Sequence, residues 1–344
     1  MALWLVRAGR HGEHEKQFLE ENRVYLTWGG LSQDLTAIKT KGELRKLLEQ
    51  IYPNATKGRI TNNTGQIWAF SKGIKAGDWI VLPSKLKPAI HIAEAKSGYQ
   101  YDPNDVAPSY HHIDVKWIAE DIPRSNFDQD ILYSFGAFMT VCQIKRNDAE
   151  QRVHGMANVG WKASPVAKAA GVEMGDEVEG EGGLEDLEQA ARDQIAKRII
   201  ALYKGHGMAR LVDAVLRAQG YTTYLSPEGP DKGIDILAAP EPMGFGEPRV
   251  CVQVKSGDSP LDRPTLDQLI GVMQNVQASH GLLVSWGGFK SSIDKEEATQ
   301  FFRVRLWDQD ELIGQILANY ERLDEDIRTE LPLKRTWLLA QLEE

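Results

Sequence analysis

The chain has 344 residues, 42% of them hydrophobic, and a formal net charge of −9. This length predicts two domains, with three as the alternative, and the hydrophobic fraction is enough for packed cores. No run approaches the roughly 18 consecutive apolar residues of a membrane span, and the opening Met-Ala-Leu-Trp-Leu-Val-Arg is too short an apolar run for a signal peptide. Only Cys142 and Cys251 are present, so neither a disulfide framework nor a cysteine zinc site follows. We expect a cytoplasmic protein.

The charge is unevenly distributed, which matters more than its total. Residues 1–100 carry 15 Lys and Arg against 9 Asp and Glu, so this part of the chain is basic. The excess of negative charge lies further on. A basic first region is compatible with a nucleic-acid partner even though the whole chain is acidic.

The first domain is predicted to cover residues 1–155 and to be mostly β. Apolar, β-branched and aromatic runs separated by Gly, Pro and Asp predict strands. These runs cover residues 3–6, 24–28, 79–82, 89–95 and 113–118. Helical spacing of Leu44, Leu47, Leu48 and Ile51 predicts a short helix over residues 43–51.

Four segments of this domain form a pattern. They are Trp-x-Val-Arg-Ala-Gly at the start, then Val-Tyr-Leu-Thr-Trp-Gly, Gln-Ile-Trp-Ala-Phe and Gly-Asp-Trp-Ile-Val-Leu-Pro. Together they resemble PUA/EVE-like domains over about 120 residues. The resemblance implies a β-barrel with helices that recognises DNA, including the reading of a modified base extruded into a pocket.

A base pocket needs aromatic faces for stacking and amides for the base edge, with cations nearby for phosphates. Trp28, Trp68, Tyr99 and Tyr101 lie near predicted turns or strand ends and are the aromatic candidates; Asn62 and Asn63 are the amide candidates. The candidate phosphate contacts are Arg7, Arg10, Lys85 and Lys87. Trp4, Trp79 and Trp117 sit inside apolar strands and are assigned to the core.

A linker is predicted over residues 156–190. Between Gly171 and Ala190 it holds eight acidic residues and five glycines but no basic residue. Such a composition indicates a solvated, flexible segment. An acidic flap that competes with DNA is the alternative.

The second domain is predicted to cover residues 191–344. The chain order is helix (195–219, clearest from Met208), strand (221–225), a hairpin-like strand pair, helix (264–278), buried strand (281–286), strand (303–307) and a helix capped at 308–312. A last amphipathic helix is predicted over residues 332–342. Gly220 is the expected stop of the first helix. This order predicts an α/β core.

The strand pair carries the chemistry. Asp235 lies on its first strand, and Gln253 and Lys255 lie on its second, which reads Val-Cys-Val-Gln-Val-Lys. Residues two apart on a strand point to the same face. If Asp235 faces them, a carboxylate, an amide oxygen and an ammonium group converge. The two oxygens suit Mg²⁺, and the lysine suits a water or a developing phosphate charge.

Asp-x-Gly-Ile-Asp-Ile followed by Val-Gln-Val-Lys resembles the Mrr-type branch of the PD-(D/E)xK restriction endonucleases. The resemblance implies a restriction-endonuclease-like core that hydrolyses phosphodiester bonds of double-stranded DNA with Mg²⁺ or Mn²⁺. Asp235, Gln253 and Lys255 would be catalytic, with Asp235 and Gln253 as metal ligands. It further implies restriction of foreign DNA. We expect this restriction to depend on modified bases, and we expect the protein to act as a homodimer.

One residue departs from the family pattern. Mrr-like proteins usually carry a Glu near the start of the first core helix, and the position we align to it is Ala209. Asp213 and Asp231 are candidates for the extra acid. Two other functions therefore stay open: a catalytically inactive nucleic-acid-binding protein, and a defence nuclease activated by RNA or a nucleotide.

Overall fold

The structure is a computed structural model that describes residues 1–136, 139–162, 187–229 and 233–337. The chain divides into two compact units, Met1–Asp193 and Gln194–Glu344. No helix within the described residues is long and apolar enough to cross a membrane. Most of the predicted linker, including the acidic stretch up to residue 186, lies outside the described residues.

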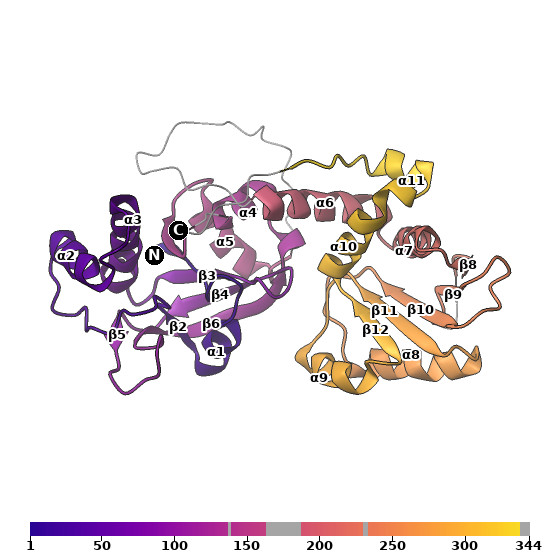
Figure 1. Ribbon diagram of the computed structural model, residues 1–344, viewed down its shortest axis with the longest axis horizontal. Coiled ribbons are helices and arrows are strands. Elements are labelled where there is room, and N and C mark those ends of the chain that lie inside the picture. Colours follow the sequence, from indigo (N-terminus) through magenta and orange to yellow (C-terminus); the bar gives the residue numbers. More distant parts are fainter. Residues whose placement is uncertain (137–138, 163–186, 230–232, 338–344) are drawn as a thin grey trace. The chain divides into compact units, whose positions relative to one another are not determined.

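The N-terminal unit mixes strands and helices (Figure 1). Its strands are β1 (Leu3–Val6), β2 (Arg23–Tyr25), β3 (Trp79–Pro83), β4 (Ala89–Ala95), β5 (Gln100–Tyr101), β6 (His111–Pro123) and β7 (Val141–Ile144). Its helices are α1 (Glu15–Glu21), α2 (Lys41–Ile51), α3 (Lys57–Trp68), the π-helical turn η1 (Ala69–Gly73), η2 (Arg124–Asn126), α4 (Gln129–Phe135) and α5 (Ala149–Asn158).

One sheet with the order β2-β6-β4-β3-β1-β7 organises this unit, and β5 pairs with β6. Both faces of the sheet are covered, since Trp4 and Val6 of β1 join one apolar core and Leu3 and Leu5 join the other. The end strands β2 and β7 are not paired with each other among the described residues. The unit is therefore an open, curled half-barrel of strands and helices.

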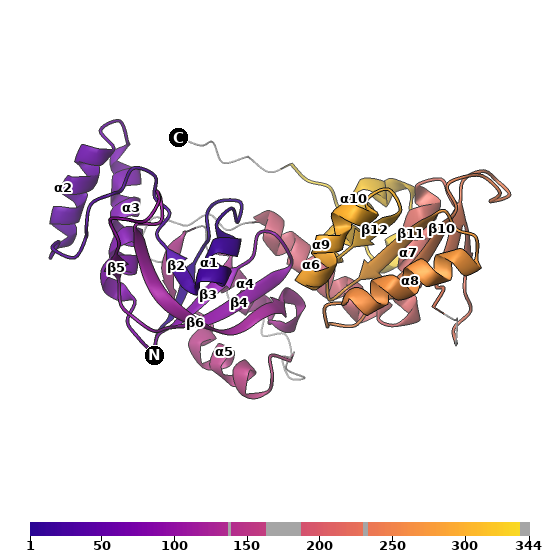
Figure 2. The ribbon, with the colours of Figure 1, turned by 90° about the horizontal axis from the view of Figure 1, so that it is seen from below.

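Helices α2 and α3 form a hairpin beside this sheet (Figure 2). Thr40 caps α2 with a reciprocal bond to Glu43, and Thr56 caps α3. Leu44 and Leu48 of α2 and Ile60 of α3 face the core. The sequence prediction missed α3, because its residues 57–68 are mostly polar. Trp68 thus ends a helix and does not lie at a predicted turn or strand end, and the amide candidates Asn62 and Asn63 lie on the same helix.

The C-terminal unit holds a five-stranded sheet with the order β12-β11-β10-β9-β8. Its strands are β8 (Thr222–Leu225), β9 (Ile236–Ala239), β10 (Val250–Lys255), β11 (His280–Ser285) and β12 (Val304–Trp307). Its helices are α6 (Leu187–Tyr203), α7 (His206–Ala218), α8 (Arg263–Asn275), α9 (Ser291–Gln300), α10 (Gln309–Asn319), η3 (Tyr320–Arg322) and α11 (Glu325–Glu330).

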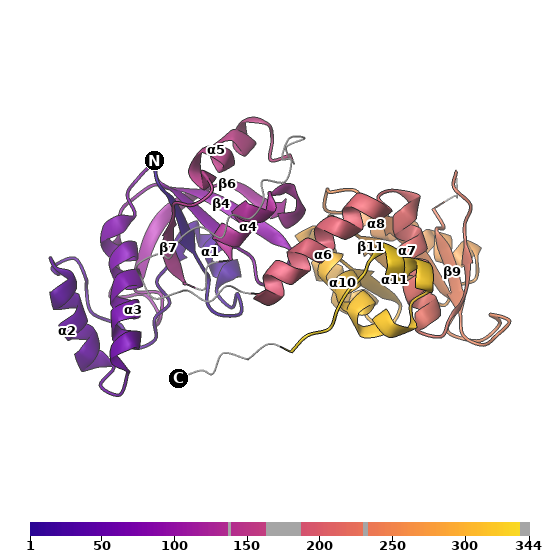
Figure 3. The ribbon, with the colours of Figure 1, turned by 90° about the horizontal axis from the view of Figure 1, so that it is seen from above.

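Alternation along the central strands fixes the two layers. Val252 and Val254 of β10 pack in the core formed with α6, α7 and α10, whereas Cys251 packs in the core formed with α8 and α9. Figure 1 shows these helix layers on opposite faces of the sheet, and Figure 3 shows the α7 side.

Two helix predictions in this unit need correction. The helix expected over residues 195–219 is two helices, because Gly205 between them adopts φ +76°, which an α-helix cannot continue through. The helix predicted over residues 332–342 is absent from its described part, since residues 332–337 have no regular structure. Leu331-Pro332 ends α11 instead, because proline cannot continue a helix and disfavours helical backbone in the residue before it.

Candidate active site

Asp235 and Gln253 lie opposite each other on neighbouring antiparallel strands. The last registered pair of β9 and β10 is Ile236 with Val252, and the backbone N–H of Asp235 donates to Val252 O over 3.0 Å. One step further along the two strands, Asp235 stands across from Gln253. Asp235 Oδ2 accepts the N–H of Val254 at 2.7 Å, which fixes the carboxylate over β10. The structure thus brings these two predicted residues together on one face.

The side chain of Gln253 is unusually buried for a polar residue. Only 1% of the residue is exposed, and its Oε1 is buried with no hydrogen-bond partner. An unsatisfied buried carbonyl costs about 1–3 kcal/mol. Such an atom next to a carboxylate is the arrangement expected of a ligand oxygen whose partner is a bound cation.

A glycine lies against this amide. Gly233 adopts φ +83°, and a methyl group added there would lie 3.4 Å from Gln253 Nε2 and 3.5 Å from Gln268 Nε2. Gln268 is an exposed residue of α8, which runs along β10 and β11 (Figure 2). Sequence reasoning assigned no role to Gly233 or to its contact with Gln268. The only signal in the sequence was the glycine two positions before Asp235.

Lys255 ends β10 and is half-buried beside β11. It is in register with Ser285, and its carbonyl accepts the N–H of Trp286 at 2.8 Å. Gly287 packs against the turn that follows Lys255, because a methyl group there would lie 2.6 Å from the carbonyl carbon of Asp258. Since side chains alternate, the Lys255 side chain leaves the strand on the face that carries Gln253.

The start of α7 adjoins the end of β10. The N–H of Gly205 donates to Ser256 Oγ at 2.8 Å, so this helix begins next to the lysine. Ala209 is buried in the apolar core and supplies no acid. Asp213, the first alternative acid, is engaged by Arg217 Nε at 3.0 Å on its own helix. Asp231, the second alternative, lies outside the described residues.

The donor set fits a hard divalent cation. Asp235 and Gln253 Oε1 supply two oxygens, and Mg²⁺ typically takes one or two protein carboxylates and completes its shell with water and phosphate oxygens. Burial, and secondly the negative charge of Asp235, raises the pKa of the Cys251 thiol to about 11, so this sulfur stays protonated below the site. No group of three or more His, Cys, Asp or Glu side chains with metal-binding placement occurs in the part of the chain that the structure describes.

The N-terminal aromatic candidates make structural contacts: the two tyrosines bond the backbone of a loop, and the tryptophans pack on a core. Tyr99 Oη accepts the N–H of Leu35 at 3.1 Å and bonds His111 Nδ1, while Tyr101 Oη donates to Ser32 O at 2.6 Å. Trp28, Trp68 and Tyr99 all pack, half-buried, against the same apolar core. Asn62 Oδ1 accepts an N–H of Gln66, and Asn63 is half-buried on the same helix.

The candidate phosphate contacts lie in two separate parts of the N-terminal unit. Arg7 donates to the carbonyl of Phe135 at 3.3 Å. Arg10, Lys85 and Lys87 lie on two adjoining loops, because a methyl group at Gly12 would touch the Cβ of Lys85 at 3.2 Å. Lys87 forms an ion pair with Asp121.

Two family models match the chain. A restriction endonuclease family (Mrr_cat) matches residues 200–316, and a domain of unknown function (DUF8426) matches residues 4–144. Among curated proteins, none matches the sequence. Residues 200–316 thus form a restriction endonuclease domain of the Mrr type, as the motif predicts.

Two solved structures are similar at a low level. The first, "DNA modification-dependent restriction endonuclease AspBHI", is 13% identical with a TM-score of 0.33, and the match covers 74% of this chain and 66% of that one, just under two thirds. The second, "MspJI Restriction Endonuclease in Complex with 27-mer Oligonucleotide", is 17% identical with a TM-score of 0.33 and covers 96% and 80%. The PUA/EVE-like resemblance of the first domain stays a prediction.

Proposed function

We propose that this protein is a Mg²⁺-dependent DNA endonuclease that restricts foreign DNA, with Asp235, Gln253 and Lys255 as its catalytic centre. The observation that carries the proposal is the buried, unpartnered Oε1 of Gln253 opposite Asp235, two residues before the strand-end Lys255 of a restriction endonuclease domain. Modification dependence, recognition by the N-terminal unit and a homodimer belong to the same proposal.

The roles follow from placement. Asp235 and Gln253 Oε1 would hold the cation, which lowers the pKa of bound water and neutralises charge on the scissile phosphate. The Lys255 ammonium, on the same face, orients the attacking water or the phosphate and stabilises the negative charge that develops on it. Water adds to phosphorus as one phosphorus–oxygen bond to a sugar breaks.

The test is cleavage by the full chain of methylated, hydroxymethylated, glucosylated and unmodified duplexes with Mg²⁺ or Mn²⁺. Asp235→Asn keeps an oxygen for the Val254 N–H, so the variant should fold, bind DNA and fail to cut. Lys255→Ala should behave alike, while Lys197→Ala, at an exposed lysine of α6, should cut normally. Normal cutting by Asp235→Asn and Lys255→Ala would refute the site.

One observation favours a second function. Ala209 occupies the position where Mrr-like proteins usually carry a helix Glu, and it is buried in the core. A protein that only binds nucleic acid would result if this loss removes metal-dependent chemistry. Plasmid that stays uncut with Mg²⁺ and Mn²⁺, in the presence of demonstrated DNA binding, would select this alternative.

A further inference from the structure

The connection between β3 and β4 presents an apolar side chain between two lysines. Pro83 and Ile90 close the strand pair, and residues 84–88 form its tip. Leu86 at this tip is 62% exposed, with Lys85 exposed on one side and Lys87 half-buried on the other. A large aliphatic side chain exposed at a loop tip gains nothing for folding, because it stays in water in the folded state.

Hydrogen bonds to two buried side chains, Ser84 and Glu15, hold the backbone of this tip. Ser84 Oγ accepts the N–H groups of Leu86 and Lys87, both at 3.1 Å, and donates to Glu15 Oε1 at 2.8 Å. Glu15 Oε2 also accepts the N–H of Lys85 at 3.3 Å. His91 of β4 contacts the same carboxylate at 3.3 Å.

This support is costly for the protein. Glu15 and His91 are almost fully buried, at 2% and 0% exposed, although burying a charged carboxylate is unfavourable unless it is well bonded. Burial by itself raises the pKa of Glu15, but the bonds from His91 and Ser84 outweigh it and the pKa is lowered. A buried ion therefore fixes the conformation of an exposed tip, which is the expected construction of a pre-organised contact.

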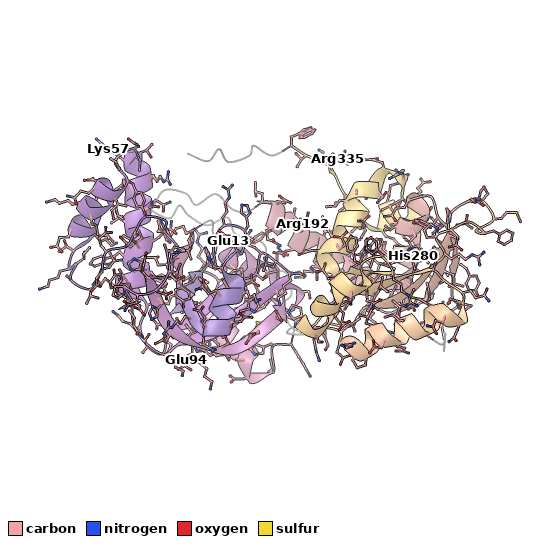
Figure 4. All side chains as sticks on the ribbon, turned by 60° about the horizontal axis from the view of Figure 1, so that its bottom comes forward. Glu13, Lys57, Glu94, Arg192, His280 and Arg335 are labelled. Carbon is pink, nitrogen blue, oxygen red and sulfur yellow. The ribbon has the colours of Figure 1, made fainter. Side chains whose placement is uncertain are left out.

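A second loop enlarges the same surface. Gly12 packs against the tip, since a methyl group there would lie 3.2 Å from Lys85 Cβ and 3.3 Å from Leu86 Cγ. Arg10 and His11 on this loop are exposed. Glu13, labelled in Figure 4, turns its carboxylate to the backbone N–H groups of Arg10 and His11, at 3.3 and 2.7 Å. The acid thus braces the loop while the basic side chains lie outside.

We propose that Leu86 is a wedge that inserts between neighbouring base pairs of duplex DNA while Lys85 and Arg10 contact the flanking phosphates; Lys87 beside them is paired with Asp121. Proteins that kink DNA insert leucine and similar apolar side chains into a base step in this way, with cations on the adjacent backbone. The inference rests on the proposed function, because it assigns the surface by which the N-terminal unit engages the nuclease substrate.

The same unit offers a matched control. Val106 is 77% exposed in the loop between β5 and β6, but its neighbours are acidic, since Asp102 and Asp105 lie in the same loop. Because DNA phosphates repel the carboxylates of this loop, we expect the loop, and Val106 with it, to stay away from the duplex. Val106→Ala therefore removes exposed apolar surface without removing a DNA contact.

The test uses full-length protein that carries Asp235→Asn, mixed with duplexes holding 2-aminopurine at successive positions. Unstacking of this base raises its fluorescence. We expect a severalfold rise on saturation by the parent protein, and no rise with Leu86→Ala together with about 10-fold or more weaker binding. Leu86→Met should retain the rise, because it keeps the apolar volume, and Val106→Ala should match the parent.

Salt dependence separates the two parts of the contact. Lys85→Ala should lower the slope of log affinity against log salt by about one, and the fluorescence rise at saturation should persist. A parent protein that binds DNA without any fluorescence rise, or a Leu86→Ala variant indistinguishable from it, overturns the wedge. Cleavage is scored separately in chains that retain Asp235. Wedge signals without any cutting would refute the nuclease alone, and cutting without wedge signals would refute the wedge alone.

Discussion

Replacement of Gln253 by methionine should stabilise the metal-free protein and abolish its response to metal. Methionine is close to glutamine in length and apolar, so it removes the buried oxygen that has no partner and keeps the volume of the side chain. Relief of an unsatisfied buried carbonyl is worth about 1–3 kcal/mol, which corresponds to roughly 2–4 °C per kcal/mol in the melting temperature of a domain of this size. Stability and function thus oppose each other at this residue.

The assay is denaturant unfolding of the parent and the variant, in chelator and with Mg²⁺ or Mn²⁺. We expect the variant to be the more stable in chelator, the parent alone to gain stability with metal, and the variant to cut no DNA. Gln219→Met is the control, since Gln219 Nε2 donates to Gln315 Oε1 at 2.7 Å and its loss should cost about 0.5–1.5 kcal/mol. A Gln253→Met protein that is less stable in chelator and still cuts DNA would refute the reasoning.

Three further predictions concern other positions. Gly233→Ala should cost about 1–2 kcal/mol, because a non-glycine residue must adopt φ +83° there; denaturant unfolding measures the loss, and unchanged stability would contradict the strain at this position. The lowered pKa of Glu15 means that its stabilisation is present above pH 4.5 and is lost as the pH falls through the folded-state pKa; in acid, Glu15→Gln should unfold with a shallower pH dependence than the parent, and equal slopes would contradict the ion's role. Burial raises the pKa of both Cys142 and Cys251 to about 11, so neither thiol should react with a maleimide near neutral pH until the protein unfolds, as mass spectrometry would detect.

The nuclease core could be predicted from the sequence because its signals are local. The alternation in Val-Cys-Val-Gln-Val-Lys gives a strand, and the structure forms β10 over Val250–Lys255. The run from Gly281 to Trp286 is strongly apolar, and β11 covers His280–Ser285. The pairing of Asp235 with Gln253 needed only that the two strands be neighbours. What no local pattern reveals is that α8 covers the polar face of β10 and buries Gln253.

The N-terminal unit was harder to predict because its geometry depends on distant contacts. The helix α3 consists largely of polar residues, and it is stabilised by Thr56 and by burial of Ile60 and Ile67 against strands far away in the sequence. Whether a curled sheet closes depends on the pairing of its end strands, β2 and β7, which propensity does not determine. No sequence pattern singled out Glu15, and only the fold shows that it supports the Leu86 tip.

The proposed function requires that Asp235, Gln253 and Lys255 form a metal-dependent cleavage centre. Its most direct test is single-turnover cleavage of bound duplex DNA by the full chain and by Lys255→Ala, with Mg²⁺ and with chelator. We predict cutting by the parent only when Mg²⁺ is present, and a loss of at least about 100-fold in rate for Lys255→Ala at unchanged DNA affinity. Cutting at parental rate by Lys255→Ala, or cutting by the parent in chelator, would refute a metal-dependent centre at these residues.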